Sequence, residues 1–211
     1  CAELPRTGQT RPVQPAATAV YDAERTLQVL DGETVREMTL ADYLVGVTAA
    51  EMPASFAEEA LKAQAVAART YTLYKLTAGS NHGDTADICT DSTCCQAYIA
   101  MEQARANWGA QADAYEKKVR DAVTSTDGEA ILYGGVPILA VFHSSSDGKT
   151  AEAGDVWSGD VPYLRSVDSP EGEETVPNYY SAAAFSAAEA KSLLAKAHPE
   201  LTLSGGPDRW F

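Results

Sequence analysis

One glutamate, Glu51, occupies a position where a carboxyl group could act as a proton donor. Leu40, Leu44 and Val47 follow the spacing of a buried helical stripe, and Glu51 is the next member of that stripe. Pro53 ends the predicted helix within a residue of Glu51, because it lacks an amide proton and restricts the residue before it. Partial burial and the negative end of the helix dipole both disfavour the carboxylate. The pattern therefore predicts a group suited to general acid catalysis.

Two cations and an amide follow Glu51 on a second predicted helix. Lys62 and Arg69 are seven residues apart and share a helical face, whereas Gln64 lies about 200° round the helix from Lys62. In regular helix Gln64 thus points away from Lys62. The alternative to a catalytic Glu51 is a structural ion pair between Glu51 and Arg69, since buried carboxylates are usually paired.

Four potential metal ligands lie within a short polar segment, His82, Cys89, Cys94 and Cys95. One imidazole and three sulfurs are the ligand set of a closed tetrahedral zinc site, and four protein ligands leave no open position for a substrate. We therefore expect structural zinc rather than catalytic zinc. The competing interpretation is a disulfide between Cys89 and either Cys94 or Cys95, as in exported proteins.

A histidine followed by three serines is the remaining cluster whose residue types could catalyse a reaction. With Asp147 it contains the residue types of a serine hydrolase. The segment has no G-x-S-x-G turn, and triad residues normally lie far apart in sequence. Adjacent serines more often satisfy the backbone of a turn, and a lone histidine such as His143 is often a rim residue. A protease or esterase is the least favoured function.

The predicted elements come in blocks of hairpins and helices. Residues 20–35 alternate loosely around Asp31-Gly32 and predict a hairpin. Thr39 and Asp42 form a capping box for the helix that ends near Glu51. Ser55, with Glu58 three residues on, is expected to cap the next helix, which continues to about Leu76.

The second half of the chain repeats this alternation. Residues 97–121 predict a helix interrupted at Asn107-Trp108-Gly109, where Asn107 could cap a second segment. Two strands follow around Gly134-Gly135, and the second is expected to reach His143 with Leu139 and Val141 on the same face. A last helix begins at Ser186 and closes at Pro199. This order predicts an α+β fold rather than a doubly wound sheet.

The length and charge limit the classes of function. The 211 residues suit one domain at 19–211, with room for two lobes around a cleft, preceded by a flexible tether at 1–18. A net charge of −14 argues against nucleic acid or anionic membrane as the principal partner. The sequence contains neither a membrane-length apolar run nor a signal peptide. Cys1 fits the lipidated first residue of a mature lipoprotein, and the alternative is an arbitrary starting point.

Four strings of the sequence resemble, in order, the blocks of the SpoIID family of sporulation proteins, whose domain is shared by the LytB amidase enhancers. They are YLVGVTAAEMPASFAEEALKAQAVAARTYTL, DICTDSTCCQAY, VFHSSSDGKT and DVWSGDVPYLRSV. The resemblance covers residues 27–180. It implies a lytic transglycosylase that cleaves the glycan strands of peptidoglycan, with Glu51 as its only general acid and base. Such an enzyme leaves 1,6-anhydro-N-acetylmuramic acid ends and needs no second carboxylate, because the sugar's own 6-hydroxyl attacks.

The resemblance also implies roles for the other candidates. Lys62, Gln64 and Arg69 would bind substrate, with Lys62 and Arg69 facing the lactyl carboxylate of muramic acid or else holding Glu51. His143 and Ser145 would line the opposite side of the site. Some members of the family carry zinc in the loop of His82, Cys89, Cys94 and Cys95, although the family often has histidine where this chain has Cys94.

The expected partners are peptidoglycan strands without stem peptides and a wall amidase. The expected location is outside the cytoplasm, anchored at the envelope of a Gram-positive bacterium. The rival to an enzyme is a LytB-like module that binds the wall and enhances an amidase without cutting glycan.

Overall fold

The computed structural model describes residues 21–157, 159–176 and 179–210, and it divides the chain into two units. The first unit comprises Cys1–Ser144 and Ala151–Val167, and the second comprises Ser145–Thr150 and Asp168–Phe211. The predicted tether at 1–18 lies outside the described residues. Helices and small sheets are mixed, which confirms the predicted α+β class.

The sheet of the first unit has the order β2-β1-β3. Strands β1 (Thr26–Asp31) and β2 (Thr34–Thr39) form the predicted antiparallel hairpin, and Gly32 supplies the positive φ of 60° at its turn. Strand β3 (Ile88–Cys89) was not predicted. It pairs in parallel with β1, with Val29 opposite Ile88, and so holds the cysteine loop against the sheet.

Helix α1 (Leu40–Glu51) has both of its predicted ends. The Asp42 backbone N–H donates to the Thr39 side-chain oxygen over 3.1 Å, which satisfies a free donor of the first turn. Met52 is extended ahead of Pro53, so the helix ends at Glu51. Local sequence alone therefore fixes where Glu51 lies on this helix.

Helix α2 (Glu58–Ala78) begins later than predicted. Ala57, not Ser55, is the residue before its first turn, because Pro53 and Phe56 close a turn in which the Phe56 N–H donates to the Pro53 carbonyl over 2.9 Å. The prediction that Ser55 caps this helix was wrong. The helix ends at Ala78, just before Gly79 at φ 108°.

The predicted interruption in the next helical segment is confirmed. Helix α3 (Met101–Trp108) ends at Gly109, whose φ of 53° breaks the helix, and a 3₁₀ turn (Gly109–Gln111) leads into α4 (Ala112–Ser125). Asn107 lies inside α3 and does not cap the second segment.

The strands after α4 are shorter than predicted. Strands β4 (Leu132–Tyr133) and β5 (Val136–Pro137) form a small hairpin, which one further bond extends, from the Ile138 N–H to the Ile131 carbonyl over 3.1 Å. The described chain from Leu139 to His143 forms no strand. The predicted alternation of faces also fails, since the neighbours Leu139 and Ala140 are both buried. Helix α5 (Ala153–Val156) is a single turn in the first unit.

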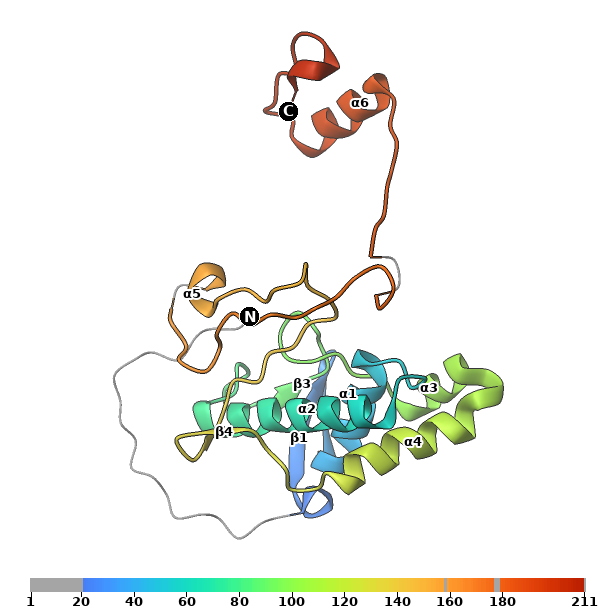
Figure 1. Ribbon diagram of the computed structural model, residues 1–211. Coiled ribbons are helices and arrows are strands. Elements are labelled where there is room, and N and C mark those ends of the chain that lie inside the picture. Colours follow the sequence, from blue (N-terminus) through green and yellow to red (C-terminus); the bar gives the residue numbers. More distant parts are fainter. Residues whose placement is uncertain (1–20, 158, 177–178, 211) are drawn as a thin grey trace. The chain divides into compact units, whose positions relative to one another are not determined.

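The core of the first unit lies where α1, α2 and α4 meet the sheet (Figure 1). These helices carry apolar residues at helical spacing, so the apolar face of each helix packs against the others. Arg69 also lies in this region with no exposed surface. The larger apolar side chains of the core that are fully buried are Leu27, Val29, Leu40, Tyr43, Leu44, Val47, Ile88, Val119, Val123 and Leu139.

Among its described residues, the second unit has one helix of appreciable length, α6 (Ala187–Ala197). Ser186 and Glu189 form the predicted capping box at its start, and the helix ends at Ala197, two residues before Pro199. A 3₁₀ turn follows at Pro207–Arg209, and an isolated antiparallel bridge pairs Lys149 with Asp168. The first unit also contains a short 3₁₀ turn at Asp22–Glu24.

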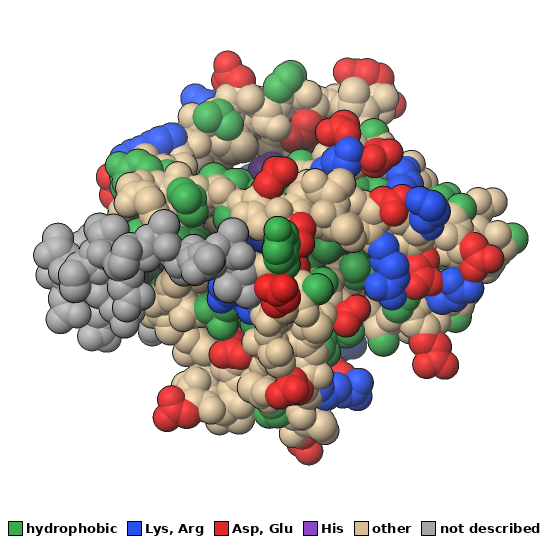
Figure 2. All heavy atoms as spheres, turned by 90° about the horizontal axis from the view of Figure 1, so that it is seen from below, with side chains coloured by type: hydrophobic (Ala, Val, Ile, Leu, Met, Phe, Trp, Pro, Cys, Tyr) green, Lys and Arg blue, Asp and Glu red, His purple; other side chains and the backbone are tan. Residues whose placement is uncertain are grey.

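Acidic side chains are dispersed over the face shown in Figure 2, among the fewer basic ones. A surface of this kind offers no concentrated positive field for a polyanion. Within the described residues, no helix has the length and apolar character needed to cross a bilayer.

Candidate functional site

Glu51 is the last residue of α1 and is partly exposed to solvent. Its Oε1 accepts a hydrogen bond of 2.8 Å from the backbone N–H of Ala97. No cation pairs with Glu51 among the residues that the structure describes. The side chain is thus held by one neutral donor, which orients the carboxyl without committing it to an ion pair.

The segment that supplies the Ala97 N–H is held against α1 by a close approach of the backbone. The Ile99 N–H donates to the Gly46 carbonyl over 3.2 Å, and the ring of Tyr98 stacks on Tyr43 with 5.9 Å between centroids. A Cβ on Gly46 would lie 2.2 Å from Tyr98 Cε2, so only glycine leaves room here. Gly46 therefore helps to position the partner of Glu51.

Lys62 forms its ion pairs on its own helix. Its Nζ lies 2.9 Å from Glu58 and 2.8 Å from Glu59, at a side-chain exposure of 25%. The hydrogen bonds to Glu59 and Glu58 raise the pKa of Lys62, so the ammonium stays charged. Lys62 does not pair with Glu51, and its charge remains near the surface at the start of α2.

Arg69 lies in a different environment from the one that its sequence position suggests. Its guanidinium is fully buried, with Nη2 2.7 Å and Nε 2.8 Å from an Asp22 oxygen. The remaining donors reach Thr126 Oγ1 and the carbonyls of Val123 and Glu129. Burial raises the pKa of Asp22, and the bonds to Arg69 oppose that shift. Neither the predicted contact of Arg69 with substrate nor an ion pair with Glu51 fits this geometry, because the donors are already used.

Gln64 is buried on α2, and its Nε2 lacks a hydrogen-bond partner among the described residues. Three other buried polar atoms share this condition: Thr48 Oγ1 on α1, Gln96 Oε1 beside Ala97, and Trp210 Nε1 in the second unit. Thr48 lies one helical turn before Glu51. Gln96 precedes Ala97, whose backbone N–H binds the Glu51 carboxyl. Unpaired buried polar atoms are costly and call for an explanation, and contact with a ligand or water would supply one.

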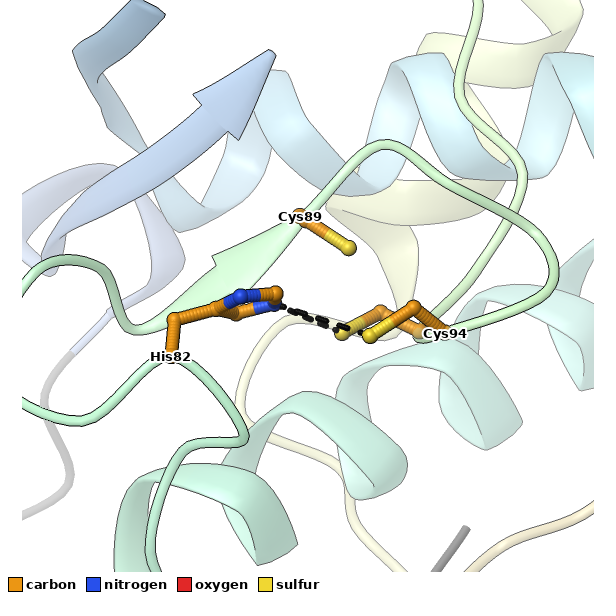
Figure 3. Close-up of side chains that lie close together, drawn as sticks. His82, Cys89 and Cys94 are labelled. Atoms are coloured by element: carbon orange, nitrogen blue, oxygen red, sulfur yellow. Dashed lines mark hydrogen bonds between the residues drawn. The ribbon is translucent and has the colours of Figure 1, made fainter. Parts of the chain in front are cut away.

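His82, Cys89, Cys94 and Cys95 do converge, as predicted. Their potential ligand atoms all lie within 4.8 Å of one another, and Figure 3 shows the labelled side chains pointing toward a common centre. His82 Nε2 lies 3.8 Å from Cys94 Sγ and 3.7 Å from Cys95 Sγ. Ligands of a tetrahedral zinc ion with bonds of about 2.3 Å are separated by about 3.8 Å, so the cluster has the right size. These three cysteines are free thiols, so the competing interpretation, a disulfide between Cys89 and Cys94 or Cys95, does not hold in this structure.

A strand pairing and a turn position the three cysteines. Parallel pairing with β1 fixes Cys89, and the N–H groups of Cys94 and Cys95 donate to the Asp91 carbonyl over 3.1 and 2.8 Å. Asn81 Nδ2 donates to Cys94 Sγ over 3.7 Å, the kind of outer contact that orients a metal ligand. Burial raises the pKa of Cys95 to about 12, so the thiol is protonated unless a cation lies beside it.

The last two candidates, His143 and Ser145, lie on either side of the boundary between the units. Both side chains are exposed. Ser145 Oγ donates to Glu171 over 2.7 Å within the second unit. Glu171 was missed in the sequence, as were Asp22 and Ala97. A backbone N–H leaves no trace in residue types, and the carboxylates lie 26 and 47 positions from the groups that they bind.

Comparisons with known proteins were made for the whole chain. Residues 31–133 match the SpoIID family model, described as Stage II sporulation protein. Stage II sporulation protein D of Bacillus subtilis (strain 168) is 38% identical over 158 residues, which are 74% of this chain and 46% of that protein. The protein of the same name from Bacillus amyloliquefaciens is 37% identical over 157 residues, 74% of this chain and 45% of that protein.

A shorter match is to the amidase enhancer of Bacillus subtilis (strain 168). It is 39% identical over 121 residues, which are 57% of this chain and 14% of that protein. The chain spans about half the length of the Stage II sporulation proteins that it matches. The matched region includes α1, α2, the cysteine loop, α3 and α4.

Proposed function

Because this chain belongs to the SpoIID family through its domain at residues 31–133, we propose that it acts on the bacterial cell wall during sporulation as a lytic transglycosylase. The substrate is the glycan strand of peptidoglycan, preferably without stem peptides. The bond cleaved joins N-acetylmuramic acid to N-acetylglucosamine. The observation that supports this most is the setting of Glu51, a partly exposed carboxyl oriented by the Ala97 N–H and not paired with a cation in the described residues.

The reaction needs one acid. Glu51 protonates the glycosidic oxygen as its bond to C1 of muramic acid breaks. The 6-hydroxyl of the same sugar forms a new bond to C1, and Glu51, now a carboxylate, accepts the proton of that hydroxyl. The product is a 1,6-anhydro ring, no water is consumed, and Glu51 returns to its starting state. A hydrolase would require a second carboxylate to act on water or on C1.

The other candidates have supporting roles in this proposal. Gln64 and Thr48 have buried polar atoms that a bound sugar or an ordered water could satisfy. Lys62 supplies a charged group for the lactyl carboxylate of muramic acid, provided that it leaves Glu58 or Glu59. His143 and Ser145 bind sugar hydroxyls. Arg69 takes no part, because its donors are occupied in the core.

A Glu51→Gln variant tests the reaction. Purified glycan strands, with and without stem peptides, are incubated with the protein, and 1,6-anhydro ends are counted by mass spectrometry. The amide has no proton to give, so we expect product formation to fall at least about a hundredfold while the fold is unchanged.

The matched control is Glu102→Gln, which neutralises an exposed acid in the first turn of α3. It should cut glycan at the wild-type rate. Anhydro ends formed at an undiminished rate by folded Glu51→Gln would remove Glu51 from the chemistry.

We also propose that the cluster of His82, Cys89, Cys94 and Cys95 binds zinc as a structural ion. The separations of the ligand atoms and the outer contact from Asn81 support this. When bound, the ion would cross-link the loop and hold its thiols as thiolates. The loop leads directly through Gln96 to Ala97, so the ion would also stabilise the donor that orients Glu51.

Metal analysis of protein purified without added zinc tests the site. About one equivalent is expected in wild type, and Cys94→Ser should lose the metal and lower the thermal midpoint. Ser92→Ala, a change in the same loop outside the ligand set, serves as the control. Less than about half an equivalent in wild type, together with a mapped disulfide, would reject the zinc site.

The second candidate function is a non-catalytic enhancer of a wall amidase. The match to the amidase enhancer of Bacillus subtilis favours it. Such a module would bind glycan and raise the rate of a wall amidase but release no soluble anhydro products. Mass analysis after incubation with glycan alone separates the two functions. Either function places the protein outside the cytoplasm, at the envelope of a Gram-positive bacterium.

A further inference from the structure

Four hydrogen-bond donors of the second unit converge on one carboxylate, that of Glu171. Its Oε2 accepts from the Ser145 hydroxyl over 2.7 Å and from the Ser146 N–H over 2.8 Å. Its Oε1 accepts from the hydroxyls of Ser146 and Ser169 over 3.0 and 2.8 Å. Two donors on each oxygen nearly exhaust what a carboxylate can accept. The serine segment is therefore organised around a single acid.

The backbone holds the two sides of this cluster together. Lys149 and Asp168 form an antiparallel bridge, and the Ser169 N–H donates to the Gly148 carbonyl over 3.0 Å. Gly148 has a φ of 97°, a conformation that favours glycine and turns the chain after the serines. Glu171 thus binds side chains whose backbones are already fixed nearby, so little entropy is lost in forming the cluster.

The bond to Glu171 determines what Ser145 can offer to a ligand. A hydroxyl has one proton to donate and lone pairs that accept. A second contact, 3.5 Å to the Ser146 carbonyl, is at the limit of a hydrogen bond, and the charged acceptor at 2.7 Å is the stronger one. The proton of Ser145 therefore points to Glu171. The exposed side of its oxygen is left as an acceptor.

This arrangement also disfavours Ser145 as a nucleophile. The hydrogen bond from Ser145, together with those from Ser146 and Ser169, lowers the pKa of Glu171 to about 2. A carboxylate that binds a proton so weakly is a poor general base. The pair consequently fits a binding role and not the activation of a serine.

We propose that Glu171 is a positioning residue for glycan binding, which orients Ser145 so that its oxygen accepts a hydrogen bond from a sugar hydroxyl. The inference rests on the proposed function, because it names the part that Ser145 plays toward that substrate. Glu171 itself does not contact the reacting atoms. Its effect is on the affinity for the strand and not on the proton transfers at Glu51.

The test is Glu171→Gln in the full chain, with glycan strands as substrate. An amide presents one acceptor and one donor, so the four serine donors can no longer all be satisfied and Ser145 loses its orientation. We expect KM to rise about five- to tenfold with kcat within about twofold of wild type. Glu173→Gln, which neutralises an exposed acid two residues away, is the matched control and should leave both constants unchanged.

A double-variant cycle separates positioning from general stabilisation. Ser145→Ala should raise KM by a similar factor, and the Glu171→Gln/Ser145→Ala double variant should be no worse than either single one, because both remove the same contact. Effects that multiply, or a fall in kcat with KM unchanged, would overturn the inference. Ser145→Ala also carries the test if Glu171→Gln folds poorly by circular dichroism.

Failure of the proposed function has a different signature. Wild-type protein that forms no 1,6-anhydro ends would overturn the transglycosylase and leave affinity for the strands to be measured directly. In that case the same cycle is read from Kd values for sedimented glycan. Unchanged Kd in Glu171→Gln would overturn the positioning role, and a weakened Kd without additivity would support it.

Discussion

Single residues differ in how far their neighbours in sequence determine their surroundings. The position of Glu51 was predictable, because a local stripe and Pro53 set both the face and the end of α1. The surroundings of Arg69 were not. Helical spacing shows that Arg69 shares a face with Lys62. It cannot predict the ion pair of Arg69 with Asp22, because Asp22 is 47 positions away in the sequence. The two cations of one stripe thus have opposite roles, one buried in the core and one paired at the surface.

Substitution of these two cations should separate their roles. Arg69→Ala leaves Asp22 as an uncompensated buried charge, so the free energy of unfolding should fall by about 3–5 kcal/mol. Lys62→Ala removes only surface pairs and should change stability little. Urea unfolding followed by circular dichroism measures both. Similar losses for the two variants would contradict the structural role of Arg69.

The titration of Glu171 gives a prediction in pH. Its folded pKa of about 2 lies below the ordinary value of 4.5, so the folded state binds this proton less tightly than the unfolded state does. The carboxylate therefore stabilises the second unit fully above about pH 4.5, and this contribution is lost as the pH falls through about 2. Carbon-13 NMR of the carboxyl group should show the low value in wild type and a higher one in Ser145→Ala. A measured pKa near 4.5 for Glu171 in the wild-type protein would refute this prediction.

At the scale of elements, the sequence predicts those helix ends that depend on contacts between residues close in sequence. The cap of α1 at Thr39 and the break at Gly109 both depend on neighbours within a few residues, and both were predicted. The start of α2 was not predicted, because a residue distant in sequence stabilises a turn at the position where the helix was expected to begin. Lys118 of α4 donates to the carbonyls of Ala54 and Phe56, which stabilises the turn in place of a longer helix. Strand β3 was missed for the same reason, since two residues of extended chain become a strand only beside β1.

Gly46 on α1 tests how one element positions another. In Gly46→Ala the new Cβ would lie 2.2 Å from the Tyr98 ring and 2.9 Å from the Ile99 carbonyl, so the segment that contains Ala97 must move away from Glu51. We expect a loss of about 1–3 kcal/mol in stability and, for the proposed reaction, a fall in glycan cleavage at saturating substrate. Gly154→Ala, which has open space around it, is the control and should be neutral. Unaltered cleavage by Gly46→Ala would show that the Ala97 contact is dispensable.

At the scale of the whole molecule, the α+β class was predictable from the order of hairpins and helices. The composition of the second unit was not. It combines Ser145–Thr150 with residues from Asp168 onward, and a discontinuous unit of this kind leaves no periodic signal in the sequence. The net charge of −14 limits the class of partner but carries no information on the fold.

Burial makes a prediction about the end of the chain. None of the residues 181–210 is buried, although α6 is well capped. Deleting 181–211 should therefore shift the thermal midpoint of the first unit by less than about 2 °C. Fluorescence of Trp108 and Trp157 follows this unit in both proteins, provided that Trp210 is replaced by Phe in the full-length chain. A fall of many degrees would mean that these residues support the first unit.

The parallel pairing of β3 with β1 has a consequence for the order of folding. The paired segments are separated by 59 positions, with α1 and α2 between them, whereas the four proposed metal ligands span only His82 to Cys95. The entropic free-energy cost of closing the shorter span is lower by about 1 kcal/mol. An ion captured by these side chains would therefore gather the loop before the sheet is complete, and the edge strand would then dock as a preformed piece. The supply of that ion would in that way set the pace at which the loop and the sheet assemble.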